Sequence, residues 1–115
     1  MNALEEFLVQ QFPVPGIVAA AMRLPDGRVL ARCDGDALTS AQVEKAIHRL
    51  GLAAESFRRH RLEARTLCWT FERACLHLAR RPDGALLALF ATRGAAAPGP
   101  GEVARLLARF TAAPG

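Results

Sequence analysis

Side chains that could carry out catalysis are few and scattered along the chain. Ser56 and His60 lie four residues apart, so a helix would place a base beside a hydroxyl group. No acidic residue is placed to orient that histidine, and a solvated helix end explains the pair better than a hydrolase does. A phosphate-binding loop needs a lysine followed by serine or threonine, and the sole lysine, Lys45, precedes alanine. The sequence therefore predicts a chain that is not an enzyme.

The cysteines and one histidine form the second group of reactive side chains. Cys75 and His77 alternate along a predicted strand and point the same way, and Cys68 could lie opposite them. A thiol or metal site is one hypothesis, but two or three scattered ligands lack the spacing of zinc sites. Buried thiols and a satisfied histidine are the favoured interpretation, so we expect no cofactor and no metal.

The composition indicates one globular domain over residues 1–115. Hydrophobic residues make up 51% of the chain and charged residues 23%, which excludes a disordered or fibrous protein. No apolar run approaches the length of a membrane span, and no basic stretch opens a secretory signal, so we expect a cytoplasmic protein without a membrane partner. The net charge is +4, but aromatic side chains are not interleaved with the basic side chains. We therefore expect no nucleic-acid partner.

Two turns with the same sequence divide the chain. Pro25-Asp26-Gly27 and Pro82-Asp83-Gly84 each suit a type I turn that a left-handed glycine closes with a bulge. Each turn therefore predicts a β-hairpin. The four strands that these hairpins join are expected at 16–24, 28–33, 75–79 and 85–92.

Helical periodicity predicts three helices. Apolar residues recur every three to four positions over 2–12, 39–61 and 102–110, and Thr39 opens a capping box with Gln42. With a further strand at 66–71, the order is α-β-β-α-β-β-β-α. The strand at 16–24 is apolar on both faces, which favours helices over both sides of it. We therefore expect an α+β fold, a five-stranded antiparallel sheet with helices on both faces.

Two features predict self-association. The strand at 66–71 follows a long helix, so it can lie at the sheet edge, where an apolar edge invites pairing with another copy. In the long helix, Gly51 interrupts the interior at about 1 kcal/mol relative to alanine. An antiparallel crossing of two copies at Gly51 would set Glu44 of one chain against Arg58 of the other. The predicted dimer interface comprises Glu44, His48, Gly51, Leu52, Glu55, Arg58, Leu67, Cys68, Trp69 and Thr70.

Each feature has an alternative. The strand could be covered by a neighbouring strand or by the chain's own helix. Gly51 could be incidental, with Arg58 pairing along its own helix with Glu55.

Basic residues are most concentrated where the long helix ends. Arg58, Arg59, Arg61 and Arg65 form a run that a solvated helix terminus explains, since cations favour the negative end of a helix. The functional alternative is a patch that receives an acidic partner or phosphate groups.

The order of these segments and their pattern of residue types resemble those of the roadblock/dynein light-chain domains. The resemblance is carried by 14–20, which reads Val-Pro-Gly-Ile-Val-Ala-Ala, by 26–31, which reads Asp-Gly-Arg-Val-Leu-Ala, and by 83–89. It implies a five-stranded sheet with the central helix on one face and the terminal helices on the other. It also implies dimers that join central helices and third strands into one continuous sheet.

The resemblance further implies a function. Members of that family look like non-catalytic scaffolds and regulators of small Ras-like GTPases, including bacterial polarity and motility GTPases. The expectation is a homodimer that binds such a GTPase. The alternative is a related profilin-like domain that senses a small molecule near His77 and the cysteines.

Overall fold

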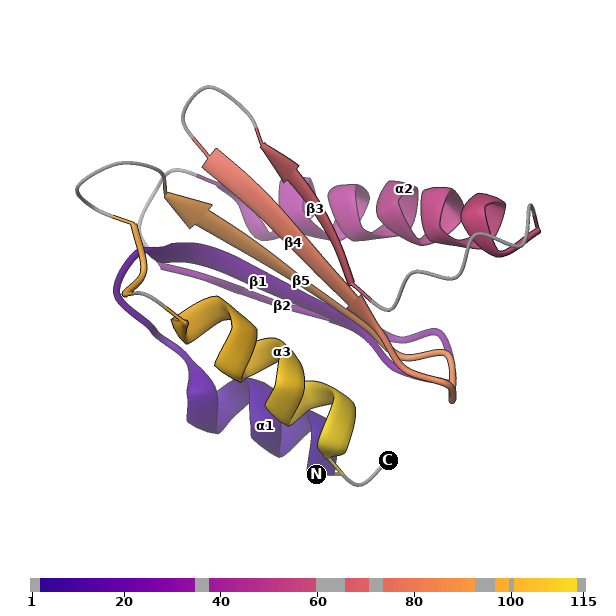
Figure 1. Cartoon of the computed structure of the whole chain (residues 1–115), viewed down its shortest axis with the longest axis horizontal. Coiled ribbons are helices and arrows are strands. Elements are labelled where there is room, and N and C mark those ends of the chain that lie inside the picture. The colour runs from indigo at the N-terminus through magenta and orange to yellow at the C-terminus, as the bar shows by residue number, and fades with distance from the viewer. Residues whose placement is uncertain are drawn as a thin grey trace.

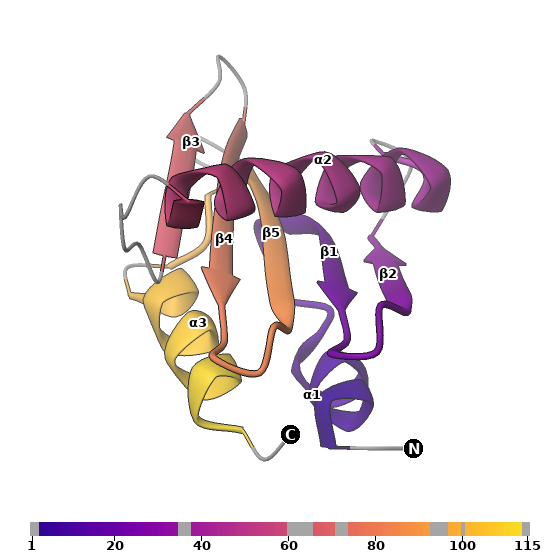
Figure 2. The same cartoon turned by 90° about the vertical axis from the view of Figure 1, so that its right-hand side faces the viewer.

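The structure is a computed structural model that describes residues 3–34, 38–59, 66–70, 74–92, 97–99 and 101–113. Its strands form one antiparallel sheet in the order β2-β1-β5-β4-β3. Helix α2 crosses one face of the sheet, and α1 and α3 cover the other (Figure 1, Figure 2). The elements are α1 (Ala3–Gln11), β1 (Ile17–Arg23), β2 (Val29–Cys33), α2 (Ser40–Arg59), β3 (Thr66–Thr70), β4 (Ala74–Arg80), β5 (Leu86–Thr92) and α3 (Glu102–Ala112).

The expectation of a five-stranded sheet needs a correction in how its strands contribute to the core. The strand residues buried in the two described core clusters belong to β1, β5 and β4, and β2 contributes partly buried side chains that pack against them. Strand β3 joins them at the edge through backbone pairing to β4 alone. The part of the sheet whose side chains are described in the core is therefore four-stranded, and β3 extends it at the edge.

Both hairpins use the same turn, as the sequence predicts. Gly27 and Gly84 each have a φ of 94°, a left-handed conformation that a side chain would strain. In each turn the aspartate, Asp26 or Asp83, accepts the backbone N–H of the second residue after it, at 3.0 Å. The bonds from Arg28 hold the pKa of Asp26 below its usual value. Local hydrogen bonds and a left-handed glycine therefore define both turns.

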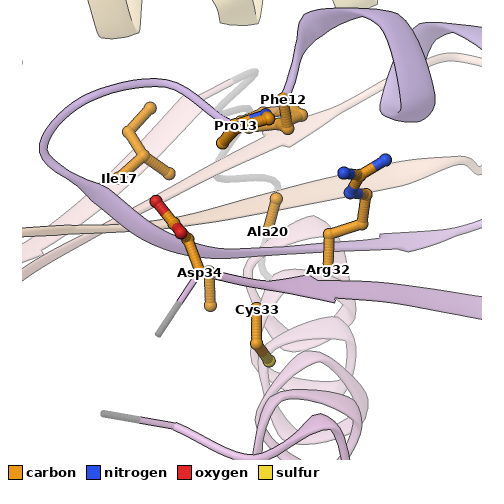
Figure 3. A pocket seen from close by; sticks show the side chains of 8 residues that line it. Phe12, Pro13, Ile17, Ala20, Arg32, Cys33 and Asp34 are labelled. Carbon is orange, nitrogen blue, oxygen red and sulfur yellow. The ribbon is translucent and has the colours of Figure 1, made fainter. Parts of the chain in front are cut away.

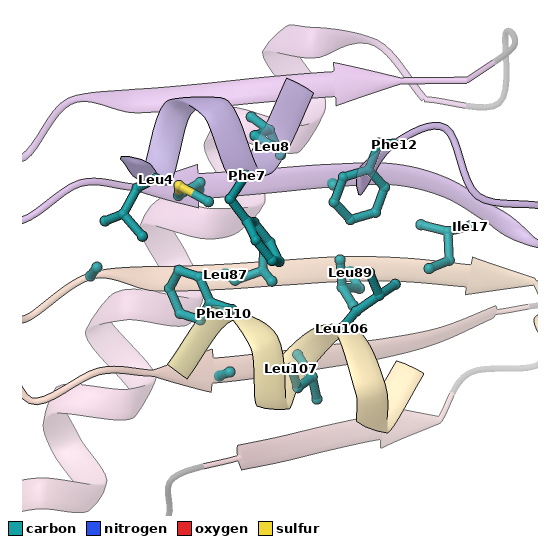
Figure 4. Packing of buried hydrophobic residues seen from close by; sticks show 14 of the residues in the cluster. Leu4, Phe7, Leu8, Phe12, Ile17, Leu87, Leu89, Leu106, Leu107 and Phe110 are labelled. Atoms are coloured by element: carbon teal, nitrogen blue, oxygen red, sulfur yellow. The ribbon is translucent and has the colours of Figure 1, made fainter. Parts of the chain in front are cut away.

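The apolar core has two parts, one on each face of the sheet. The first lies under α1 and α3, where the rings of Phe7 and Phe110 meet with centroids 6.0 Å apart (Figure 4). The second lies under α2 around Val43 and Ile47, neither of which has any exposed surface. From Ala19 to Met22, successive residues of β1 alternate between the two parts. The prediction that helices cover both faces of β1 is confirmed.

The first turn of α2 is held by the predicted capping box. The Gln42 backbone N–H donates to the Thr39 hydroxyl oxygen at 3.1 Å, and the Thr39 backbone N–H donates to the Gln42 side-chain oxygen at 2.9 Å. Two donors that the helix leaves unpaired are thereby satisfied.

Helix α3 is fastened to the β4–β5 hairpin by one buried arginine. Arg81 is 7% exposed, and it forms an ion pair with the Asp83 carboxylate at 3.1 Å. Its guanidinium donates to the Phe110 carbonyl oxygen at 3.0 Å and lies 5.6 Å from the centre of that ring. A buried charge is tolerated only where such partners satisfy it, so this contact fixes where α3 ends on the sheet.

Candidate functional site

Strand β3 lies at the sheet edge, one of the alternatives that the sequence left open. It pairs with β4 on one side, with Trp69 opposite Leu76 and Cys68 opposite His77 in register, and no described strand pairs with its other side. The side chains of 66–70 lie outside the described part of the chain. An unpaired row of backbone N–H and C=O groups is a template for a further strand.

The outer face of α2 carries exposed residues from the predicted interface. Glu44, His48 and Leu52 are exposed, and Glu55 is half-buried. Leu52 is 62% exposed, and in the described ranges only Val9, on α1, is another exposed large hydrophobic side chain. Leu52 lies on the face of α2 that points away from the core. An exposed leucine in such a place is the kind of side chain that an interface covers.

Gly51 is the exception, and its predicted place in the interface is wrong. The residue is buried, and a Cβ atom there would lie 2.7 Å from Nη1 of Arg23 and 3.2 Å from Cδ1 of Leu86. Glycine therefore leaves room for the Arg23 guanidinium beneath α2, and a second copy cannot approach it. The pairing of Glu44 with Arg58 across a crossing at Gly51 loses its basis.

This packing predicts how Gly51 responds to substitution. Gly51→Ala should be nearly neutral, because a gain of about 1 kcal/mol in helix propensity offsets the displacement of a flexible guanidinium. Gly51→Val should destabilise the protein by about 1–3 kcal/mol, because two further methyl groups are added to a Cβ that already lies close to Arg23 and Leu86. Urea unfolding measures both, and Ala53→Val, at a half-buried position of α2, controls for the helix propensity of valine. Equal losses at 51 and 53 would show that Arg23 and Leu86 do not matter.

The predicted acidic-partner patch is only partly described. Helix α2 runs through Arg58 and ends at Arg59, so both residues belong to its last turn. Their side chains lie outside the described part of the structure, as do Arg61 and Arg65. The patch therefore stays a prediction.

Cys75 and His77 line an open hollow of about 370 Å³ between β4 and the start of α3. The prediction that both face the same side of the strand is confirmed. Burial lowers the pKa of His77 below its ordinary value. Within the described ranges, no three histidine, cysteine or acidic side chains gather as metal ligands would.

The lowered pKa of His77 predicts a pH dependence of stability. Because the unfolded chain has the ordinary value near 6.5, it binds a proton before the folded chain does as the pH falls. The stabilisation from neutral His77 is therefore complete above pH ~6.5 and decreases as the pH falls toward the folded pKa. Thermal unfolding should show this decrease in the wild type and less of it in His77→Gln. His48→Gln, at an exposed site, should behave as wild type, and a reversal of the two variants would contradict the assignment.

A smaller cavity, which no sequence pattern predicted, lies on the same face of the sheet. It has a volume of about 100 Å³ and lies where Phe12 and Pro13 follow α1 and pass over β1 and β2. Arg32 and Asp34 stand at its rim (Figure 3). In the sequence, the signal for this cavity was the pair of opposite charges, Arg32 and Asp34, two residues apart at the end of an edge strand.

Comparison with known proteins identifies the fold. No family model matches the chain, and no curated protein matches it. The structure is similar to the gliding protein MglB from Thermus thermophilus, with a TM-score of 0.69 and 18% identity, over 95% of this chain and 88% of that one. It is also similar to MglB in a tetrameric arrangement, with a TM-score of 0.65, 17% identity and the same coverage.

The fold is the roadblock fold. The resemblance carried by 14–20, 26–31 and 83–89 is confirmed at this level. The residues of the predicted interface lie on two elements of this fold, α2 and the edge strand β3. In the described part of the chain, no helix combines the length and the apolar character needed to cross a membrane.

Proposed function

We propose that this chain is a dimeric, non-catalytic interaction module that scaffolds or regulates a small Ras-like GTPase. The observation that carries the proposal is the edge strand β3, whose outer side pairs with no described strand, in a roadblock fold similar to MglB. The regulatory role is inferred from the family resemblance. Members of that family look like scaffolds and regulators of small GTPases and are not usually enzymes themselves.

The dimer part of the proposal rests on two surfaces of one chain. Two copies of β3 that pair antiparallel would satisfy each other's outward backbone groups and continue the sheet across the dimer. The exposed Leu52 on α2 would lose its contact with water in the same assembly. Self-association of a protein with this fold has a precedent, since one MglB structure is described as a tetrameric arrangement.

The partner part of the proposal rests on charge. The net charge of +4 favours acidic partners, and the basic run Arg58, Arg59, Arg61 and Arg65 is the predicted place for one. A GTPase surface that docks there would present carboxylates to these arginines. Binding should therefore weaken as the salt concentration rises.

Sedimentation over a concentration series, combined with amide hydrogen exchange, tests the dimer. The sedimentation coefficient should rise with concentration, and the amides of residues 66–70 should become more protected over the same range. Weak dimers form at concentrations of about tens of micromolar. A chain that still sediments as a monomer in this range would contradict the proposal. Binding of a small GTPase from the same genome, loaded with GDP or with a GTP analogue, then tests the partner.

The alternative is a profilin-like domain that senses a small molecule. It is favoured by the hollow that Cys75 and His77 line. A ligand there should raise the melting temperature of the wild type and not that of His77→Ala. The absence of any such stabilising compound, together with GTPase binding, would favour the first proposal.

A further inference from the structure

The cavity below Phe12 has an apolar floor and walls. Phe12, Ile17 and Ala20 line it and are 6%, 2% and 0% exposed, so they are fixed parts of the core. The exposed Pro13 forms part of the rim (Figure 3). An aliphatic group that enters would leave water for a preformed apolar surface.

The rim of the cavity carries one positive and one negative side chain. Arg32 and Asp34 are two residues apart, so both project to the same side of the backbone, the side of Phe12 and Pro13 (Figure 3). Arg32 is half-buried and Asp34 is exposed, and the backbone of Asp34 is held because its N–H donates to the Val18 carbonyl oxygen at 2.8 Å. The described ion pairs of the chain join neither Arg32 nor Asp34 to any side chain.

This charge arrangement selects the kind of ligand. A simple anion would bind Arg32 but meet the Asp34 carboxylate, and a simple cation would meet the Arg32 guanidinium. A zwitterion can satisfy both, with its carboxylate on Arg32 and its ammonium on Asp34. Neither rim charge then remains without a partner when the ligand excludes water.

The volume of the cavity limits the apolar part of the ligand. A dry protein cavity of about 150 Å³ accommodates benzene, so about 100 Å³ accommodates roughly four carbon atoms. The side chains of valine and leucine are of this size. From charge and volume together, we propose that this cavity binds a free α-amino acid with a small aliphatic side chain.

The proposal does not depend on the proposed GTPase function. Neither α2 nor β3 contributes a residue to the cavity, so a chain that stays monomeric can still bind the amino acid. The dimer and the amino-acid site can therefore fail separately. Each has its own measurement.

Titration of the full chain with L-valine, followed by NMR, tests the site. The amide resonances of Ala20, Arg32 and Asp34 should shift saturably. Isovalerate, which lacks the ammonium group, and isobutylamine, which lacks the carboxylate, should each bind at least ~10-fold more weakly. If isovalerate binds as tightly as valine, or if valine causes no saturable shift at these residues, the proposal is wrong.

Variants of the rim residues complete the test. Arg32→Gln and Asp34→Asn should each weaken valine binding by ~10-fold or more while the chain stays folded. Arg28→Gln is the matched control, because Arg28 lies just before β2 and pairs with Asp26 and Glu5 away from the cavity. Equal weakening by Arg28→Gln would show a general loss of positive charge and would overturn the assignment.

Discussion

The Leu52→Glu variant is expected to remain monomeric at concentrations where the proposed dimer of the wild-type chain forms. Leu52 is 62% exposed on the outer face of α2, so a dimer that covers it would have to bury the new carboxylate. In a symmetric dimer the substitution also introduces two like charges into one interface. The dissociation constant measured by sedimentation should rise at least ~10-fold, or about 1.4 kcal/mol.

The chain offers a matched control for this variant. Val9 is 49% exposed and lies on α1, on the opposite face of the sheet from α2. Val9→Glu makes the same kind of change at a comparable exposure, and it should leave dimer formation as in the wild type. If Leu52→Glu dimerises as well as Val9→Glu does, the outer face of α2 is not part of the interface, and the edge of β3 would have to act without it.

The Phe110→Ala variant should show the largest loss of stability. The ring of Phe110 has no exposed surface, and it contacts both Phe7 and the guanidinium of Arg81. Removing it leaves a cavity between α3 and the sheet, at a cost of about 3–5 kcal/mol. This is a large fraction of the stability of a domain of this size, so denaturant unfolding should begin at a much lower concentration.

Two further variants separate the contributions at this site. Phe110→Leu retains most of the volume but loses both ring contacts, so its loss should be about 1–1.5 kcal/mol. Arg81→Met removes the donor to the Phe110 carbonyl oxygen and should cost about 1–3 kcal/mol. Arg109→Ala, at an exposed position of α3, is the control and should stay within about 0.5 kcal/mol of wild type. Similar losses for Arg109→Ala and Arg81→Met would contradict a specific role for the buried guanidinium.

Much of the fold follows from interactions that are short in sequence. The two Pro-Asp-Gly turns and the Thr39–Gln42 capping box each involve residues within a few positions, so the sequence is sufficient to predict them. The double-sided apolar pattern of β1 likewise indicates that it lies between two helical layers. The long helix before β3 means that this strand need not pair with β2, and the sequence left its edge position open until the structure placed it there.

The candidate sites depend on contacts that are long in sequence. Periodicity places Gly51 near the edge of the apolar face of α2. It contains no information on Arg23, whose long side chain reaches under this helix from β1. The cavity beside Arg32 likewise exists only because Phe12 and Pro13 pass over β1 and β2.

The sequence by itself determined the order of the elements, both hairpin turns, the start of α2 and the resemblance to roadblock domains. Those features depend on backbone preferences and on neighbouring side chains. Only the tertiary structure decided that Gly51 faces its own sheet, that Arg81 is buried against Phe110, and that two opposite charges stand over an apolar cavity. These arrangements depend on how segments distant in sequence pack in space, which local patterns do not encode.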